Sequence, residues 1–342
     1  MDVIGRFKRW ASGPGRTRTL SVALLLAIAA AYPLFADSVG QDLAVRITYY
    51  VLLVASWNLL AGYAGLYSFG HVAFAAVGAY STVVLVARHD LPLELSFLIG
   101  GLIAGGVGAL LGLLSSRIRG PYLIVASFGL LVAVQTVVLA NPSQTGGASG
   151  SIVPSLLSGP DTELSYYGIG LFLVALFFLV SVVLLRTRAG KVFAALRDDE
   201  DGAIAIGVNP LPWKTAIFAY TSFWAGVAGV FLAYYTGFIT PSIGGVPEMS
   251  MVVAMGIAGG LGTLVGPVVS TGALLWLSDR LRVIGEGYSS LLFGVVLLFV
   301  VLVVPWARRR LRKPPAGATE SRTTPSLDDV EPVGSLGATG RS

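Results

Sequence analysis

The sequence predicts an all-α polytopic membrane protein with about ten transmembrane or re-entrant helical segments. Of its 342 residues, 55% are hydrophobic and only 12% are charged, which excludes a soluble globular fold. The apolar residues fall in blocks of roughly 20, the length that crosses a hydrocarbon core of about 30 Å. The alternating ten-residue segments of a membrane β-barrel do not occur.

Each apolar block is expected to form a membrane segment. The first follows a basic stretch and resembles a signal peptide, but the many later blocks favour an uncleaved helix. We therefore expect a basic N-terminus at 1–19, a transmembrane domain at 20–306 and a disordered tail at 307–342, which is rich in Pro, Ser, Thr, Gly and charge. The blocks lie near residues 20–36, 43–64, 66–87, 95–114, 121–140, 166–185, 214–235, 249–277 and 288–306.

The distribution of basic residues predicts the orientation of these segments. Lys and Arg are frequent before residue 20, at Arg117 and Arg119, between 186 and 214, and after 306. The loops 141–165 and 236–248 contain neither residue. By the positive-inside rule the first group is cytoplasmic and the two loops are external, so both termini are expected in the cytoplasm.

A cytoplasmic C-terminus requires one block to reverse direction within the membrane, because two full crossings after residue 248 would leave the tail outside. Segment 249–277 is too long for one untilted span and contains a run of glycines that ends in Pro267. Gly and Pro break helices, and irregular backbone at membrane depth survives only when protein covers it or it lines a cavity. We expect a broken or re-entrant hairpin here.

The stretch from Asn58 to His71 combines glycines with polar side chains inside apolar sequence. An unpaired polar group in hydrocarbon costs several kcal/mol, and each glycine weakens a helix by about 1 kcal/mol relative to Ala. This stretch and the 259–267 run, one in each half of the chain, fit a transporter built around a central path. The alternatives are that the glycines only permit close packing and that His71 only bonds within the bundle. The expected path or gate residues are Asn58, Gly62, Tyr63, Gly65, Tyr67, Ser68, Gly70, His71, Gly259, Gly260, Gly262, Thr263, Gly266 and Pro267.

The cytoplasmic loop 186–213 predicts a short amphipathic helix that docks a soluble partner. It combines an apolar stripe (Val192, Ala195, Leu196) with an acidic cluster and ends in Gly-Val-Asn. A solvated loop that only satisfies topology is the alternative. The residues expected to couple to the partner are Arg188, Gly190, Arg197, Asp198, Asp199, Glu200, Gly207 and Asn209.

No pattern in the sequence predicts catalysis or a bound metal or cofactor. The run Ala189-Gly190-Lys191 lacks the upstream glycine of a nucleotide-binding loop, and there is no cysteine or clustered His set. Charges deep within the blocks are few, since Asp42 and Asp279 fall near block ends. This argues against an ion-coupled carrier and for an external energy source. The net charge is +5. Because the basic residues cluster at segment ends, this charge does not suggest nucleic-acid binding.

Five motifs resemble the LivM-type permeases of branched-chain amino acid ABC importers. They span roughly residues 45–305, in the order of that family. They are Asn58–Tyr80, Thr145-Gly146-Gly147 with Gly150, Arg188–Asn209, Ala225–Gly229 and Gly259–Pro267.

The resemblance implies an ABC importer permease fold in a bacterial cell (inner) membrane, embedded in lipid. It implies a LivH-like second permease subunit, two separate cytoplasmic ATPases that use ATP and Mg, and an extracytoplasmic solute-binding protein. On this basis the chain is not an enzyme, and its 186–213 loop would seat in an ATPase cleft. The external loop, with Thr145, Gly146 and Gly147, would meet the binding protein.

Two departures from the family pattern and several functions stay open. Tyr67 stands where many relatives carry Leu or Gln, and Gly202 where alanine is common. Leucine, isoleucine and valine are the expected substrates, while urea, amides or other small solutes fit the same architecture. A stand-alone channel or ion-coupled carrier would not need the acidic amphipathic loop, and a membrane enzyme lacks a nucleophile or ligand cluster.

Overall fold

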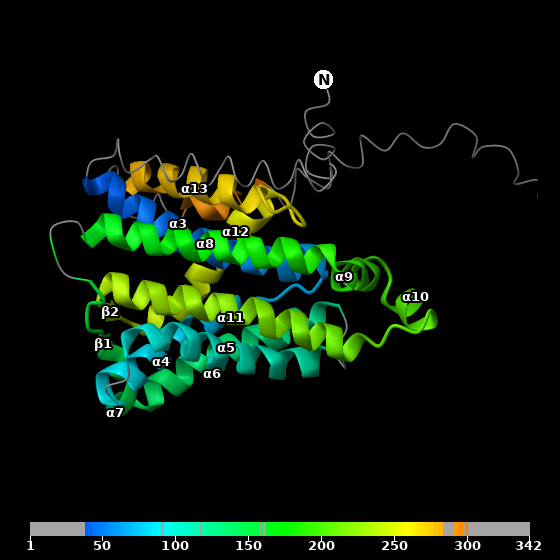
Figure 1. Ribbon diagram of the computed structural model, residues 1–342, viewed down its shortest axis with the longest axis horizontal. Helices are drawn as coiled ribbons and strands as arrows, with labels where there is room; N and C mark the ends of the chain where they lie inside the picture. Colours follow the sequence, from blue (N-terminus) through cyan, green and yellow to red (C-terminus); the bar gives the residue numbers. More distant parts are fainter. Residues whose placement is uncertain are drawn as a thin grey trace, which may run out of the picture. The chain divides into compact units, whose positions relative to one another are not determined.

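The computed structural model describes residues 38–89, 92–116, 118, 120–157, 159, 162–282, 291–296, 298 and 299. The chain divides after Leu298 into two compact units, and only Phe299 of the second is described. The described part of the first is almost entirely helical, which confirms the all-α class (Figure 1). In chain order its elements are α3 (Ser38–Asn58), η2 (Leu59–Tyr63), α4 (His71–His89), α5 (Leu93–Ser115), α6 (Pro121–Ala140), α7 (Pro142–Thr145), η3 (Gly147–Ser149), β1 (Ser151–Ile152), α8 (Thr162–Arg186), α9 (Arg188–Asp198), α10 (Glu200–Ala205), α11 (Pro210–Thr236), β2 (Phe238–Ile239), η4 (Pro241–Gly244), α12 (Val246–Gly259) and α13 (Gly266–Arg282).

Within the described residues, five helices are long and apolar enough to cross a membrane. Two further apolar helices, α4 and α12, are shorter. The chain is therefore a multi-pass membrane protein. The five membrane-length helices are Gly40–Tyr63, Glu94–Ser115, Tyr122–Ala140, Thr162–Arg186 and Pro210–Thr236.

The central element is α11, which packs against α3, α4 and α5 (Figure 1). Its contact with α4 depends on glycines, which have no side chain to separate the two backbones. A Cβ built on Gly229 would lie 1.9 Å from the carbonyl oxygen of Ala75, and one on Gly78 would lie 2.1 Å from that of Gly226. In lipid, where apolar side chains gain nothing by leaving water, such close backbone packing is the main attraction between helices.

Helix α5 approaches α11 in the same way along its length. A Cβ on Gly108 would lie 2.1 Å from Ser222 Oγ, and one on Gly112 would lie 2.7 Å from the Cα of Thr215. The glycines of α5 thus form one face that fits α11. The opposite face of α5 carries exposed apolar side chains such as Leu102 and Leu110, as expected for contact with lipid or another subunit.

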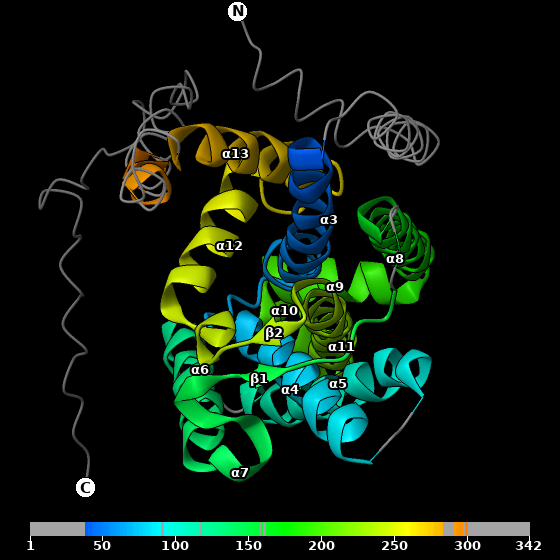
Figure 2. The ribbon, with the colours of Figure 1, turned by 90° about the vertical axis from the view of Figure 1, so that its left-hand side faces the viewer.

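Helices α12 and α13 form an antiparallel hairpin that reverses the chain (Figure 2). Ser270 Oγ on α13 donates to the carbonyl of Met255 on α12 at 2.7 Å, and Gly259 faces Gly266 near the turn. The 14 residues of α12 extend only about 21 Å, less than a hydrocarbon core. The break predicted within 249–277 is therefore present, and the reversal within the membrane stays a prediction.

The two ends of the bundle differ. At one, β1 and β2 form a two-stranded antiparallel sheet in which Ser151 pairs with Ile239 and Ile152 with Phe238. This sheet ties the 141–165 and 236–248 loops together, and we call it the strand end. At the other end α9 and α10 connect α8 to α11, and we call it the loop end (Figure 1).

Some predicted segments lie outside the described residues. These are 1–19, 20–36, Arg117, Arg119, most of 288–306 and the 307–342 tail. The count of ten membrane segments and the three-part division of the chain therefore stay predictions.

We predict that Gly229→Ala destabilises the protein, because the new methyl group would overlap the Ala75 carbonyl. Overpacking of this kind costs about 1–3 kcal/mol. The measurement is the midpoint of thermal unfolding of the detergent-purified protein. Gly106→Ala is the matched control, since a Cβ there meets nothing within 4 Å. Equal midpoints for the two variants would contradict the packing argument.

Candidate functional site

The polar glycine-rich stretch interrupts the helix that precedes it. After α3 the chain makes one π-helical turn, η2, and residues 64–70 have no regular structure before α4 begins at His71. Gly65 has φ of +72°, in the left-handed region that favours glycine. We call residues 59–70 the first break; π-helical turns of this type are frequent at functional sites.

The second break comprises residues 260–265, between α12 and α13. Gly260 and Gly262 have φ of +88° and +76°. A Cβ on Gly266 would lie 1.8 Å from the carbonyl oxygen of Gly259, so the two arms meet backbone to backbone. These glycines allow both the turn and the close approach.

Asn58 joins the two breaks. Its Nδ2 donates to the carbonyl of Thr263 at 2.5 Å, and its Oδ1 accepts from the N–H of Gly262 at 3.1 Å. The side chain is buried. A Cβ on Gly62 would lie 2.1 Å from the Gly262 nitrogen, so the two glycine backbones are in direct contact. One amide side chain thus supplies partners to backbone groups that a helix would otherwise satisfy.

The other polar side chains of the first break are also bonded within the bundle. His71 Nε2 lies 2.9 Å from Ser56 Oγ, and both residues are fully buried. His71 Nδ1 has no partner among the described residues. Trp57 Nε1 donates to the carbonyl of Ser68 at 2.8 Å. His71 thus bonds inside the bundle, as one of its two interpretations proposed.

The remaining predicted path residues surround this junction. The N–H of Phe69 donates to Ser127 Oγ on α6 at 2.8 Å, and a Cβ on Gly70 would lie 2.2 Å from the Ser127 carbonyl oxygen. Tyr67 is 46% exposed and borders a cavity, while Pro267 is buried in the first turn of α13.

The loop end folds as two helices rather than one. Thr187 caps α9 by accepting from the Ala189 N–H at 3.2 Å. A Cβ on Gly190 would lie 2.2 Å from the Leu185 carbonyl oxygen, so α9 can turn tightly against α8 only with glycine there. The expected stripe is displaced, because Ala189, Phe193 and Leu196 are the buried residues of α9. Val192 and Ala195 are only half-buried.

An ion pair holds α10 in place. Lys214 Nζ is 2.7 Å from Glu200 Oε1 and also donates to the Ser115 carbonyl at 3.5 Å. The Lys214 side chain is only 4% exposed, so the pair is shielded from solvent on one side. The ion pair connects α10 to the start of α11 and the end of α5. Gly207, at φ of +89°, then turns the chain toward Asn209.

Asn209 caps α11, because its Oδ1 accepts from the Leu211 N–H at 3.1 Å. The outer surface of α10 and its C-cap is mixed. Ile204 and Ile206 are 42% and 78% exposed. The exposed acidic residues Asp198, Asp199 and Asp201 precede them in the chain.

Arg197 connects the loop end to the first break. Its Nη1 donates to the Gly62 carbonyl at 3.2 Å, and its Nε and Nη2 donate to Asp198 Oδ1 at 3.0 and 2.9 Å. A Cβ on Gly65 would lie 2.8 Å from Arg197 Cγ. Two breaks distant in sequence and the end of α9 therefore meet in one place, which the sequence alone did not indicate.

The predicted docking residues at the strand end are held inside their loop. Thr145 Oγ1 donates to the carbonyl of Val138 at 2.6 Å and accepts from the Gly147 N–H at 3.2 Å. Gly146 and Gly147 have φ of +78° and +55°. These residues shape the loop, while Ala148 and Ser149 present its exposed surface.

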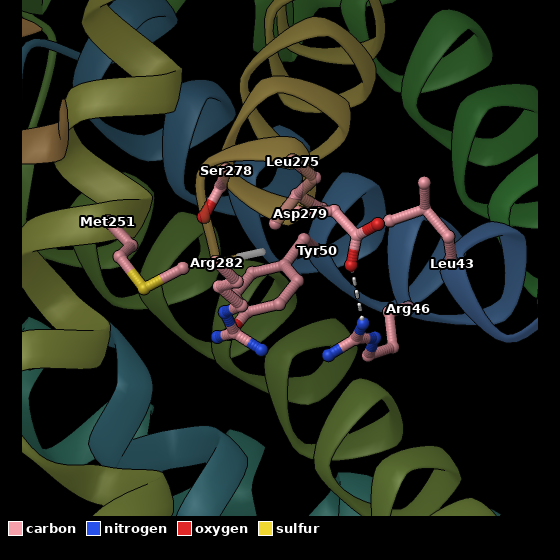
Figure 3. A pocket seen from close by; sticks show the side chains of 8 residues that line it. All are labelled: Leu43, Arg46, Tyr50, Met251, Leu275, Ser278, Asp279 and Arg282. Atoms are coloured by element: carbon pink, nitrogen blue, oxygen red, sulfur yellow. Dashed lines mark hydrogen bonds and ion pairs between the residues drawn. The ribbon is translucent and has the colours of Figure 1, made fainter. Parts of the chain in front are cut away.

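The structure adds a charged cluster that sequence reasoning missed (Figure 3). Arg46 on α3 contacts Asp42 Oδ2 at 3.2 Å and Asp279 Oδ1 on α13 at 3.5 Å. Tyr50 donates to Glu248 Oε2 on α12 at 2.7 Å. Asp42 lies in the first turns of α3, and Asp279 lies near the end of α13. The i,i+4 spacing of Asp42 and Arg46 at the start of the 43–64 block is the signal that could have indicated this cluster.

The described residues offer no group of His, Cys, Asp and Glu that could hold a metal ion. What the junction offers instead is a set of hydrogen bonds between three chain segments.

Comparisons with known proteins identify a family. The profile of the family described as branched-chain amino acid transport system / permease component matches residues 41–301. The high-affinity branched-chain amino acid transport system permease protein LivM of Escherichia coli is 29% identical over 322 residues, 86% of this chain and 76% of the relative.

Two further similar proteins are also named as permease proteins, but of other types. The permease protein LivH of Salmonella typhimurium is 24% identical over 75% of this chain and 89% of its own length. The autoinducer 2 import system permease protein LsrC of Yersinia enterocolitica is 27% identical over 65% of this chain and 63% of its own length. No solved structure matches the chain.

We predict that Asn58→Leu destabilises the protein, since it leaves the Gly262 N–H and the Thr263 carbonyl without their partner. Each unpaired buried group costs about 1–3 kcal/mol. Thermal unfolding in detergent measures the effect. Asn141→Leu is the matched control, because the exposed Asn141 side chain bonds only to the Val137 carbonyl of its own helix end. A variant at position 58 as stable as the one at 141 would refute the role of Asn58.

Proposed function

The chain belongs to the family of permease components of branched-chain amino acid transport systems, and we propose that it forms half of the translocation path of an ATP-driven importer. In this proposal a LivH-like subunit forms the other half, and two separate ATPases hydrolyse ATP with Mg. The observation that carries the proposal is the bond from Arg197 to the Gly62 carbonyl, which connects the loop end to the two breaks.

The loop end is the proposed ATPase-docking element. Ile204 and Ile206 are exposed and lie beside acidic side chains. Together they form a small apolar surface with a charged rim, a common composition for a protein–protein interface. Movement of the loop end would shift Arg197 against the first break. The residues assigned to coupling are Arg188, Gly190, Arg197, Asp198, Asp199, Glu200, Gly207 and Asn209.

The joined breaks are the proposed path or gate. Irregular backbone at membrane depth suits a path because its free carbonyl and N–H groups can face a solute. The contact between Gly62 and Gly262 has no interlocking side chains, so the two breaks can separate by breaking a few hydrogen bonds. This gives the junction two accessible arrangements without unfolding a helix.

The proposed orientation follows the positive-inside rule. The loop end and both termini face the cytoplasm, and the strand end faces outward in a bacterial inner membrane. The loop of Thr145, Gly146 and Gly147 would then present its exposed neighbours to a solute-binding protein. Exposed Ile152 and Phe238 on the strands extend that surface.

Leucine, isoleucine and valine are the proposed substrates, because the LivM and LivH relatives carry branched-chain amino acid transport in their names. A second candidate is the import of another small solute by the same mechanism. The similarity to LsrC, named for autoinducer 2 import, favours that alternative.

The test is uptake into proteoliposomes that contain this chain, the partner permease, the ATPases and the binding protein. The uptake of radiolabelled leucine is compared with that of radiolabelled urea, in both cases with ATP inside the vesicles. We expect leucine uptake that requires both ATP and the binding protein. Urea uptake alone would reassign the substrate, and leucine uptake that persists without the ATPases would overturn the importer.

We predict that Ile206→Glu uncouples the ATPases. A charge in the centre of an apolar contact should reduce ATPase co-purification and leucine uptake at least about tenfold, equivalent to 1.4 kcal/mol of binding. Ile206→Val is the matched control and should retain both ATPase co-purification and leucine uptake. Quantitative membrane immunoblots establish equal levels, and an unaffected Ile206→Glu complex would remove α10 from the docking surface.

A further inference from the structure

A cavity of about 330 Å³ lies between the first break, the start of α6 and the loop end. Its volume is at the lower end of the range for small-molecule sites, which is about 300–1,000 Å³. Its lining includes Tyr67 of the first break and Arg197 and Glu200 of the loop end, but the roles proposed above assign no ligand to it. It is distinct from the small charged pocket beside α13 in Figure 3, which measures about 50 Å³.

The lining of this cavity has two chemically different parts. One part is apolar and includes Leu66 of the first break, Leu123 and Ile124 of α6, and Leu196 of α9. The other part is charged and consists of Arg197, Glu200 and Lys214. A ligand that fits both must carry an aliphatic body and charges of both signs.

The charged groups keep bonding capacity for such a ligand. Arg197 has five N–H donors and uses three, toward Asp198 and Gly62. Among the described residues, Glu200 bonds only to Lys214, through Oε1. A carboxylate can therefore bind Arg197, and an ammonium group can bind the second oxygen of Glu200.

We propose that this cavity binds the zwitterion of an aliphatic amino acid, and that its occupancy holds the importer inactive. The carboxylate would bind Arg197, the ammonium group Glu200, and the side chain would pack on Leu123 and Ile124 of α6. Because Arg197 also bonds to Gly62, the ligand ties the loop end to α6 and to the first break. Its identity as the imported product, arriving from the cytoplasm, rests on the proposed function.

The experiment uses the complete importer in proteoliposomes with ATP inside, with or without unlabelled leucine inside. Internal leucine is expected to lower the initial rate of external leucine uptake by about fivefold or more. Internal leucinamide, which lacks the carboxylate, and 4-methylpentanoate, which lacks the ammonium group, are expected to have no effect.

Ile124→Trp fills the cavity from α6 and is expected to abolish the inhibition while uptake into leucine-free vesicles persists. Val125→Trp is the matched control, because the neighbouring Val125 is 68% exposed and does not line the cavity. It should remain inhibited like the unaltered protein. Uptake without inhibition by internal leucine, or equal inhibition of Ile124→Trp, overturns the site and leaves the importer function intact.

A binding measurement keeps the proposal testable if uptake of leucine itself fails. Equilibrium dialysis measures labelled leucine bound to the permease–ATPase complex in nanodiscs, without the binding protein. We expect about tenfold weaker binding by Ile124→Trp and by Glu200→Gln than by Val125→Trp. Absence of binding, or equal binding by all three variants, overturns the site.

Discussion

The backbone groups released by two helix breaks need hydrogen-bond partners inside an apolar bundle, and the arrangement around the breaks depends on meeting that need. Asn58 supplies one donor and one acceptor to the second break, and Arg197 supplies a donor to the first. Because glycine backbones must touch for these bonds to form, Gly62 and Gly262 cannot carry side chains. The glycine content of both stretches follows from this geometry.

The bundle divides into a tightly packed part and a part held by few bonds. Around α11, glycines on α4 and α5 bring backbones together over several turns, and an added methyl group would clash at many points. At the breaks, individual hydrogen bonds of Asn58 and Arg197 accompany the backbone contact of Gly62 with Gly262, and at the loop end the ion pair of Glu200 with Lys214 joins α10 to α11.

Hydropathy and charge predicted much of this arrangement. The lengths of the apolar blocks predicted the long helices. The charge of the loops predicted a reversal within 249–277, and the chain turns there between α12 and α13. Which helix faces meet was not predictable, because Asn58 and Gly262 are 204 residues apart and any apolar face can turn toward lipid or protein. The two-residue strands were too short to leave a pattern, and the buried face of α9 shares only Leu196 with the expected stripe.

The loop end and the second break lie together because both bond to the end of α3 and the turn that follows it. At about 21 Å, α12 ends before it would cross a hydrocarbon core, so its terminal carbonyls need protein partners. These partners come from the hairpin itself, because the Gly259 carbonyl accepts from Thr263 Oγ1 at 3.3 Å and the Met255 carbonyl accepts from Ser270 Oγ at 2.7 Å. Asn58 bonds instead to backbone groups of the second break, and Arg197, whose side chain is 41% exposed, extends the contact to the surface of the loop end. In the importer proposed above, this side chain would let movement of α9 or α10 reach the breaks without being transmitted along the length of a helix.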